Sequence, residues 1–325
     1  MSTAFIFPGQ GSQSVGMLGS IADENPAYGE IITSTFKQAS DVLGYDLWEL
    51  TQNGPESELN NTRITQPAML AAGYALWQIW KSKEGIVPAV MAGHSLGEYT
   101  ALVCAEALDF SDAINLVSLR GKYMQDAVAD VEGAMAAVLG LEDDVVIKVC
   151  EDTAIAMNDS TQEGAQKKIV SAVNFNAPGQ VVIAGHSDAV EQAILAANEA
   201  GAKKTVKLAV SVPSHCSLMD SAAQKLAKKL QSTEFDRPVI PVINNVHVTI
   251  ENETDTIRDA LVKQLSHPVR WVETINKMVA EGTDHIVECG PGKVLTGLNR
   301  RINRRMPAYA MFDSATIDKV FEEVS

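Results

Sequence analysis

Residues 93–99, Gly-His-Ser-Leu-Gly-Glu-Tyr, decide how this chain is expected to fold. The apolar run before them, residues 86–92, predicts a short buried strand, and the run after them, residues 100–105, predicts a buried helix. A strand, a Gly-x-Ser-x-Gly turn and a helix form a nucleophile elbow, in which the glycines permit a turn tight enough to expose the serine hydroxyl. The pattern predicts an α/β fold with Ser95 as a nucleophile. The alternative is a glycine turn with a capping serine.

A second Gly-His-Ser triplet, residues 185–187, is an internal control for this interpretation. It also follows an apolar run, but it continues with Asp188 and Ala189 and so lacks the second glycine. We therefore expect Ser187 to be the N-cap of a helix that carries Asp188 and Glu191 in its first turn, and not a nucleophile.

Length and charge limit the class of protein. A chain of 325 residues can bury one large core plus a subdomain. The formal net charge of −15 at pH 7 argues against a nucleic-acid partner, because binding to phosphates needs a basic face.

Cysteines and hydropathy bear on metals, redox state and membranes. The cysteines are scattered without Cys-x-x-Cys spacing, which argues against a disulfide framework or a metal site; they are Cys104, Cys150, Cys216 and Cys289. Reduced thiols fit a cytoplasmic enzyme. The N-terminus lacks the basic region of a signal peptide, and the longest apolar stretch, residues 67–80, is too short and too polar to span a bilayer. We expect a cytoplasmic protein with no membrane partner.

The order of the expected elements predicts two units. A strand at residues 5–7 and helical patterning over residues 27–81 precede the elbow. From Gly133 the pattern changes to strands at 134–140, 169–174, 180–184 and 203–210, with helices at 143–156 and 188–200. This βαββαβ order is that of a ferredoxin-like unit. We expect it, at residues 131–207, to be inserted into a larger α/β domain made of residues 1–130 and 208–325, with further strands at 239–243 and 285–289.

A serine nucleophile needs a base, and His215 is the candidate that stands out among six histidines. It follows an apolar run at residues 207–212 and begins a helix expected over residues 216–230. Near a helix N-terminus the macrodipole would keep the imidazole neutral and able to accept a proton. The alternative, a helix-capping surface histidine, stays open. Cys216 is a rival nucleophile, but its surroundings do not resemble an elbow.

The base must also be oriented, and no acidic residue presents itself for that role. A helix expected over residues 257–266 must end near His267 and Pro268. Its last carbonyls, around Gln264, lack partners within the helix and could accept the second imidazole N–H. An ordinary water-capped helix end is the alternative.

Arg120 lies on a helical stripe expected to be buried, which contains Ala113, Val117, Met124 and Ala127. A buried guanidinium needs an anionic partner, best a carboxylate held by two hydrogen bonds. That partner is either an internal Asp or Glu, or the carboxylate of a substrate.

These motifs occur together with four others, at residues 7–13, 174–176, 211–215 and 290–295. In this combination the chain resembles the malonyl-CoA:acyl-carrier-protein transacylases of bacterial fatty-acid synthesis over essentially its whole length. The resemblance implies an α/β-hydrolase-like core with a ferredoxin-like insert. It implies malonyl-CoA and acyl carrier protein as partners and no cofactor, and we expect a monomer.

The resemblance also implies residue roles. Ser95 would be acylated, with His215 as base and then acid, oriented by the main-chain carbonyl of Gln264. The backbone N–H groups of Gln10 and Leu96 would form the oxyanion hole. Arg120 would bind the malonyl carboxylate.

Two other functions stay open from the sequence: a serine hydrolase or thioesterase of the α/β-hydrolase type, and a non-catalytic module that binds carrier proteins. One departure concerns selectivity. Related acyltransferase domains that select malonyl groups often have a bulky residue just before the histidine, where this chain has Ser214. A basic run near the C-terminus could steer the carrier protein or the CoA phosphates, or it is a solvated helix face; its members are Arg300, Arg301, Arg304 and Arg305.

Overall fold

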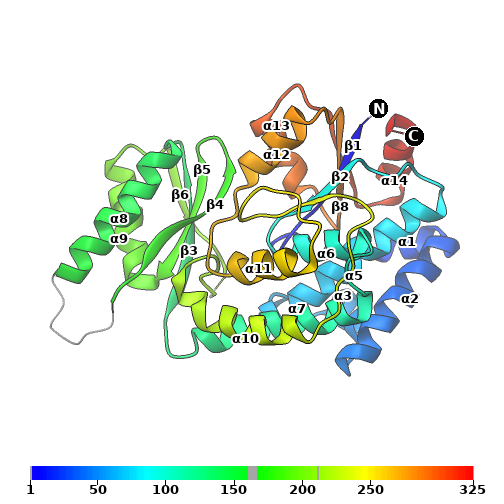
Figure 1. Ribbon diagram of the computed structural model, residues 1–325, viewed down its shortest axis with the longest axis horizontal. Helices are drawn as coiled ribbons and strands as arrows, with labels where there is room; N and C mark the ends of the chain where they lie inside the picture. The colour runs from blue at the N-terminus through cyan, green and yellow to red at the C-terminus, as the bar shows by residue number, and fades with distance from the viewer. Residues whose placement is uncertain (1, 160–166, 211, 325) are drawn as a thin grey trace.

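Five parallel strands form the larger of two sheets in the computed structural model, which describes residues 2–159, 167–210 and 212–324 (Figure 1). In spatial order they are β7 (Val242–Ile243), β2 (Val90–Gly93), β1 (Thr3–Phe7), β8 (His285–Cys289) and β9 (Ala308–Met311). The central strand β1 is apolar along its length because both of its faces are covered. Phe5 and Phe7 belong to one core cluster, and Ala4 and Ile6 to another on the opposite face.

Helices cover both faces of this sheet. The Phe5 side carries most of them: α1 (Gly19–Glu24), α2 (Pro26–Leu43), α3 (Leu47–Asn53), α4 (Glu56–Leu59), α5 (Thr62–Ser82), α6 (Gly97–Cys104), α7 (Phe110–Ala127), α10 (Asp220–Gln231), α11 (Thr254–Gln264) and α14 (Ser314–Val324). The Ile6 side packs against α12 (Trp271–Ala280) and α13 (Val294–Ile302). The larger unit is therefore a three-layered α/β structure. The α/β class is the one that the sequence predicts.

The second sheet is antiparallel and lies beside the first, at the left of Figure 1. Its spatial order is β4 (Val170–Ala177), β5 (Gln180–His186), β3 (Gly133–Leu139) and β6 (Lys204–Lys207). The helices α8 (Asp143–Asp159) and α9 (Ser187–Glu199) cover one face, where side chains such as Ala136 and Ile183 form a core cluster with them. The chain runs β3-α8-β4-β5-α9-β6, which is the expected order of elements.

The other face of the antiparallel sheet turns toward the larger unit. Its side chains, among them Met135 and Val182, cluster with Cys216. Two backbone hydrogen bonds join β4 to Val269, which lies just before α12 of the larger unit. The N–H of Phe175 donates to the carbonyl of Val269 at 3.0 Å, and the N–H of Val269 donates to the carbonyl of Val173 at 2.9 Å. Side chains from both units therefore meet in one place.

Some expected boundaries are wrong. The strands expected at residues 86–92 and 239–243 shrink to β2 and β7. Pro88 lacks the N–H that a central strand such as β2 needs, and β7, at the edge of the sheet, pairs with β2 only through Val242 and Ile243. The strand expected to reach residue 210 ends with β6 at Lys207.

Two expected helix starts also differ from the structure. His215 is followed by a short 3-10 helix, η1 (Ser217–Met219), before α10 begins. Ser187 is the first residue of α9 and not its cap, since His186 occupies the N-cap position. Across the described ranges, none of the helices combines the length and the apolar character that a bilayer crossing requires.

Candidate active site

Ser95 lies in the turn between β2 and α6, with a left-handed φ of 52°. The glycines on either side permit this turn. A Cβ on Gly93 would lie 1.8 Å from the carbonyl carbon of Gly97, and a Cβ on Gly97 would lie 2.0 Å from the carbonyl oxygen of Phe7. Only glycine fits at either position, so the strand-turn-helix geometry expected of an elbow is present.

Ser95 and His215 lie 120 positions apart in the sequence and meet in the fold. Ser95 Oγ lies 2.8 Å from His215 Nε2, and His215 Nδ1 lies 2.7 Å from the main-chain oxygen of Gln264. Because a carbonyl oxygen can only accept, Nδ1 carries the proton and Nε2 presents its lone pair to the serine hydroxyl. The arrangement is that of a nucleophile, a base and a group that orients the base.

The His215 imidazole is neutral. Burial, together with the positive charge of Arg120, lowers the pKa of His215 to about 3. The imidazole is neutral as expected, but the cause is not the helix macrodipole proposed from the sequence. The 3-10 turn of η1 separates His215 from the start of α10. His215 is buried and not the surface cap that the alternative predicts.

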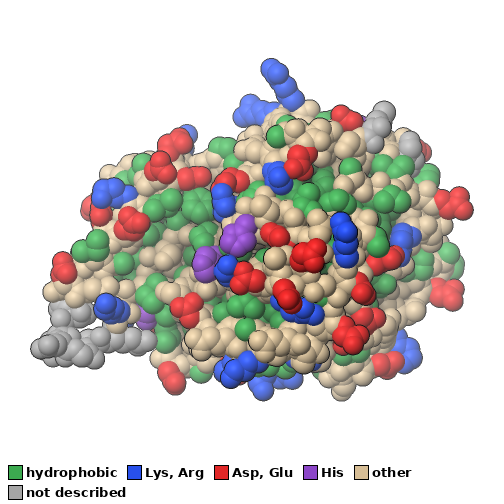
Figure 2. Space-filling model, viewed as in Figure 1, with side chains coloured by type: hydrophobic (Ala, Val, Ile, Leu, Met, Phe, Trp, Pro, Cys, Tyr) green, Lys and Arg blue, Asp and Glu red, His purple; other side chains and the backbone are tan. Residues whose placement is uncertain are grey.

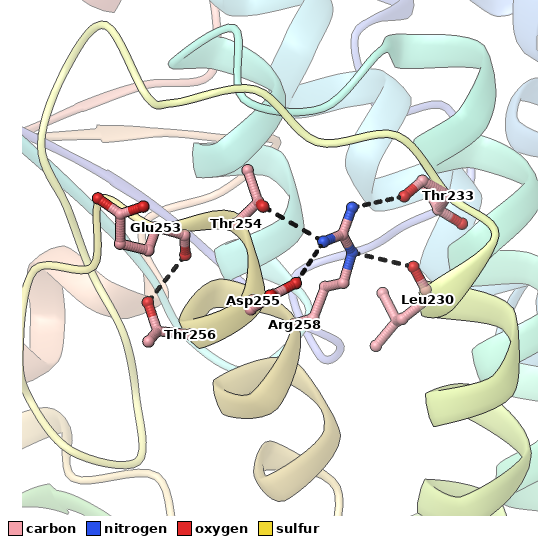
Figure 3. Close-up of polar contacts among 7 residues, drawn as sticks. All are labelled: Leu230, Thr233, Glu253, Thr254, Asp255, Thr256 and Arg258. Carbon is pink, nitrogen blue, oxygen red and sulfur yellow. Dashed lines mark hydrogen bonds and ion pairs between the residues drawn. The ribbon is translucent and has the colours of Figure 1, made fainter.

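Arg258 fixes the helix that presents Gln264. Its Nε and Nη2 donate to the carbonyls of Leu230 and Thr233 at the end of α10, both at 3.1 Å, while Nη1 donates to Asp255 Oδ1 at 2.9 Å at the start of α11 (Figure 3). Arg258 thereby ties α11 to α10, the helix that follows the His215 segment. Gln264, whose main-chain oxygen contacts His215, is the last residue of α11.

Arg120 is fully buried on α7, as the stripe predicts, and contacts Ser95. Nη1 donates to Gln66 Oε1 at 2.9 Å, and Nη2 donates to Gln264 Oε1 at 3.0 Å and Ser95 Oγ at 3.2 Å. Among the described residues Arg120 forms no salt bridge and its Nε–H has no hydrogen-bond partner. The internal ion pair offered as an alternative is thus not found within the described chain.

A cleft of about 180 Å³ opens onto Ser95 between the two units. The larger unit and the His215 segment contribute polar groups to it, and the antiparallel sheet and its edges contribute an apolar wall. Its lining includes Gln10, Gln66, His94, Leu96, Arg120, Met124, Met135, Asn174, Asn176, Val182, Leu208, Val210, Ser214 and His215. Every site residue expected from the sequence lines this cleft except Gln264, which lies behind His215.

Two backbone donors at this cleft are free. Among the described residues, the N–H groups of Gln10 and Leu96 donate no hydrogen bond. Leu96 is the N-cap residue of α6, and Gln10 lies in the loop after β1. Free N–H groups beside a nucleophile can stabilise an oxyanion.

Three residues that contact this site were not recognised in the sequence. Asn245, just after β7, accepts the Ser95 N–H at 2.6 Å and donates to the carbonyl of Gly93 at 2.6 Å. Glu98 lies in the first turn of α6, and Gln66 lies in α5. Each of the three could have been found from the sequence. Asn245 follows a strand at the edge where parallel strands end, and Glu98 and Gln66 are polar residues within apolar helical runs.

Other candidates are not brought to the cleft. Ser187 lies in α9, where its N–H donates to the carbonyl of Glu132 at 2.8 Å. Cys216 is buried, and burial raises its pKa to about 11, which disfavours the thiolate that a nucleophile requires. All four cysteines are free and buried. Ser211, part of a motif quoted above, lies outside the described residues.

Comparison with known proteins agrees with this geometry. The acyl transferase domain family matches residues 4–310. The chain is 52% identical over 319 residues to the malonyl CoA-acyl carrier protein transacylase of Escherichia coli (strain K12), which covers 98% of each chain. It is similar, with a TM-score of 0.91 and 52% identity, to the crystal structure of an acyl carrier protein S-malonyltransferase from Vibrio cholerae, over 98% of this chain and 100% of that one.

A solved complex is also similar. It contains a type II PKS acyl-carrier protein with its malonyl-transacylase, and the matched chain has a TM-score of 0.93 and 51% identity over 99% of this chain and 100% of that chain. The family expected from the sequence motifs is thereby confirmed. With a match over nearly its full length and more than half of the residues identical in the Escherichia coli relative, the chain belongs to the acyl transferase domain family.

Proposed function

We propose that this protein transfers a malonyl group from malonyl-CoA to the phosphopantetheine thiol of an acyl carrier protein, for fatty-acid biosynthesis. The observation that carries the proposal is the position of Arg120. Its guanidinium is buried without a carboxylate partner among the described residues and lies 3.2 Å from Ser95 Oγ. A short acyl group that ends in a carboxylate would supply the missing anion when it is attached to Ser95.

In the first half-reaction Ser95 Oγ attacks the thioester carbon of malonyl-CoA and passes its proton to His215 Nε2. The carbonyl oxygen becomes an oxyanion and accepts hydrogen bonds from the N–H groups of Gln10 and Leu96. Collapse breaks the carbon–sulfur bond. His215 returns the proton to the departing CoA sulfur, which leaves a malonyl ester on Ser95.

The second half-reaction reverses these steps with a different thiol. The carrier thiol gives its proton to His215 Nε2 and attacks the ester carbon, and Ser95 Oγ leaves with that proton. Because one site serves both thiols in turn, the kinetics are ping-pong. Water must not replace the carrier thiol, and the apolar side chains of Met135 and Val182 on the antiparallel sheet and of Met124 on α7 support the exclusion of water from the ester.

The two alternative functions account for fewer of the observations. A serine hydrolase or thioesterase would use Ser95 and His215 but has no need of a buried, unpaired Arg120 beside them. A non-catalytic module that binds carrier proteins would need neither the Ser95–His215 hydrogen bond nor the Gln264 carbonyl behind it. The transfer reaction uses all of these groups.

The finer architecture is part of the proposal. We interpret residues 1–130 and 208–325 as an α/β-hydrolase-like catalytic domain and residues 131–207 as a ferredoxin-like subdomain. The parallel sheet and the βαββαβ order support this division. A monomer in the cytoplasm stays our expectation.

Intact-protein mass spectrometry after mixing with malonyl-CoA tests the proposal. The parent protein should gain the mass of one malonyl group, and addition of carrier protein should remove it. Ser95→Ala should abolish the gain, and Ser187→Ala, the matched control in the second Gly-His-Ser triplet, should not. Labelling that survives Ser95→Ala would overturn the assignment of the nucleophile.

A further inference from the structure

Glu98 is a buried carboxyl one helical turn beyond Ser95, and the steps proposed above do not use it. Its side chain is 3% exposed. A single oxygen, Oε2, accepts from Gln264 Nε2 at 2.8 Å and from the backbone N–H of Asn245 at 3.0 Å. Gln264 contacts His215 and Arg120, and Asn245 accepts the backbone N–H of Ser95. Glu98 is therefore connected to the site through these two residues.

The contacts with Glu98 and with the main-chain oxygen of Ser95 fix which way the Gln264 amide faces. An amide can present either its oxygen or its NH₂ group in a given direction. Gln264 Nε2 donates to Glu98 Oε2 and to the main-chain oxygen of Ser95 at 3.0 Å. With the NH₂ group committed to these acceptors, Oε1 faces the other way and accepts from Arg120 Nη2 at 3.0 Å.

Protonation of Glu98 does not remove this constraint. Burial raises the pKa of Glu98 to about 7, while its hydrogen bonds from Gln264 and Asn245 and the charge of Arg120 oppose the rise. A proton on Oε1 leaves Oε2 as the acceptor of both N–H groups. The amide of Gln264 is therefore oriented in either protonation state.

As a result, no anion in direct contact with Arg120 competes with an incoming substrate carboxylate. The oxygen partners of Arg120, Gln66 Oε1, Gln264 Oε1 and Ser95 Oγ, are all neutral. Glu98 does not contact Arg120 directly, because the side-chain amide of Gln264 lies between them; burial lowers the pKa of Arg120, and the charge of Glu98 opposes that shift. A carboxylate in direct contact would hold the guanidinium equally well but would compete with an incoming carboxylate.

We propose that Glu98 is a positioning residue for selectivity, which acts through the Gln264 side chain to hold the Arg120 guanidinium ready for the carboxylate of the acyl group. The inference rests on the proposed function. Glu98 touches no reacting atom, and its loss should show in the choice between malonyl and acetyl groups more than in the chemistry common to both.

Glu98→Met tests this because methionine has a similar volume and offers no strong acceptor. The ratio of kcat/KM for malonyl-CoA to that for acetyl-CoA should fall about tenfold or more, the size expected when one hydrogen-bonded contact to a charged group is lost. Any disturbance through Asn245 and the Ser95 turn would lower both rates alike and leave the ratio unchanged. Glu98→Gln should restore the ratio to within a few-fold of the parent, because its amide oxygen can accept the same two hydrogen bonds.

A charge exchange and a matched control sharpen the test. In the double variant Glu98→Gln with Gln264→Glu, the carboxylate moves into direct contact with Arg120, so malonyl transfer should fall while acetyl transfer persists. The control is Glu288→Met, which removes another fully buried glutamate, one that accepts from the N–H groups of Leu295 and Thr296 at the start of α13. It should lower the melting temperature without changing the malonyl-to-acetyl ratio.

The outcomes separate the two proposals. If the parent protein transfers malonyl groups but Glu98→Met keeps the parental ratio, or the charge exchange leaves malonyl transfer intact, the role of Glu98 is overturned and the proposed function stands. If the parent protein shows no malonyl transfer, the proposed function itself fails.

Discussion

At the scale of single residues, two side chains contact one oxygen atom. Ser95 Oγ is within hydrogen-bond distance of His215 Nε2, a neutral base, and of Arg120 Nη2, a fixed cation. Arg120 raises the cost of protonating His215, which keeps the base free, and it offers a charge to whatever acyl group Ser95 carries. In the proposed reaction one guanidinium would serve both the resting base and the bound acyl group.

The low pKa of His215 leads to a prediction about pH. Since the base form is the neutral imidazole, a folded-state pKa of about 3 means that the base stays available as the pH falls through 6.5, the ordinary value for histidine. We expect kcat/KM for malonyl-CoA to show no acid limb from His215 between pH 8 and about pH 5. His215→Ala should lower the rates of acylation and of transfer together, by about 10²–10⁴-fold.

Stopped-flow acylation measured across this pH range checks the prediction. Glu98 also titrates in this region, because burial raises its pKa to about 7, so the profile of Glu98→Gln is needed beside that of the parent. An acid limb near pH 6.5 that persists in Glu98→Gln would mean that His215 titrates normally, contrary to its burial.

Arg120 gives a second prediction at this scale. Breaking one side of a buried charge pair costs about 3–5 kcal/mol, so Arg120→Ala should lower malonyl transfer by about 10²–10³-fold or more. Acetyl transfer does not use the contact and should hold steady or improve. Rates with both acyl-CoAs, taken with melting temperatures, provide the check. Equal losses for both substrates together with a large drop in melting temperature would show that Arg120 stabilises the fold and does not recognise the substrate.

At the scale of secondary-structure elements, the site depends on how closely β2, α6 and β1 approach one another. The approach is possible only because Gly93 and Gly97 lack side chains: the Cβ contacts of 1.8 Å and 2.0 Å described above are with backbone atoms, which cannot move aside cheaply. The same closeness brings the N–H of Leu96 to the loop after β1 that contains Gln10. The elbow and the expected oxyanion hole are therefore one structural feature.

Gly93→Ala tests this dependence. We expect the variant to lose acylation and to unfold at lower temperature, because the added methyl group would overlap the backbone of Gly97. The control is Gly297→Ala, on the exposed side of α13, where an added Cβ meets nothing within 4 Å. That variant should keep full activity and gain about 0.5–1 kcal/mol of stability, the usual difference between alanine and glycine inside a helix. A fully active Gly93→Ala protein would contradict the elbow geometry.

At the scale of the whole molecule, charge is unevenly distributed on a strongly acidic chain. Arg300, Arg304 and Arg305 border a hollow at the end of α13, and Arg301 hydrogen-bonds to Gln180 at the start of β5. In Figure 2, Lys and Arg side chains project at the top of the view, over α13. β4 and β5 form one hairpin, and Asn176 on β4 lines the cleft. Of this basic cluster, Arg301 contacts the hairpin that borders the cleft.

We expect this cluster to steer an acidic carrier protein, or the phosphates of CoA, toward the cleft. Arg300→Glu with Arg304→Glu should raise the apparent KM for carrier protein, and more strongly at low salt, where screening is weak. Lys37→Glu reverses a single charge on the exposed surface of α2, serves as a control and should have little effect on this KM. Steady-state kinetics at two ionic strengths decide the matter, and an unchanged KM at low salt would mean that the arginines form only a solvated helix face.

Much of this molecule was determined by local sequence pattern. The elbow around Ser95, the buried stripe that carries Arg120 and the change to a βαββαβ order after Gly133 are all encoded in the spacing of apolar residues and glycines, because a strand or a helix repeats its environment every two or about 3.6 residues. The exact ends of β2, β6 and β7 were not predictable in this way. A short apolar run does not reveal where its hydrogen-bonding partner stops.

Only the tertiary structure decided which polar groups meet. Gln264 lies 169 positions from Ser95 and 144 from Arg120 along the chain, yet it contacts both and also presents its carbonyl to His215. Glu98 and Asn245 join the same network across 147 positions. Contacts over such separations depend on how the strands of the parallel sheet are ordered and how α7 and α11 pack against it, and no local pattern carries that information. The sequence by itself predicted Ser95 as nucleophile, His215 as base and Arg120 as a buried cation. The packing of the helices around the sheet determined that this cation is held by the amides of Gln66 and Gln264 and contacts no carboxylate among the described residues.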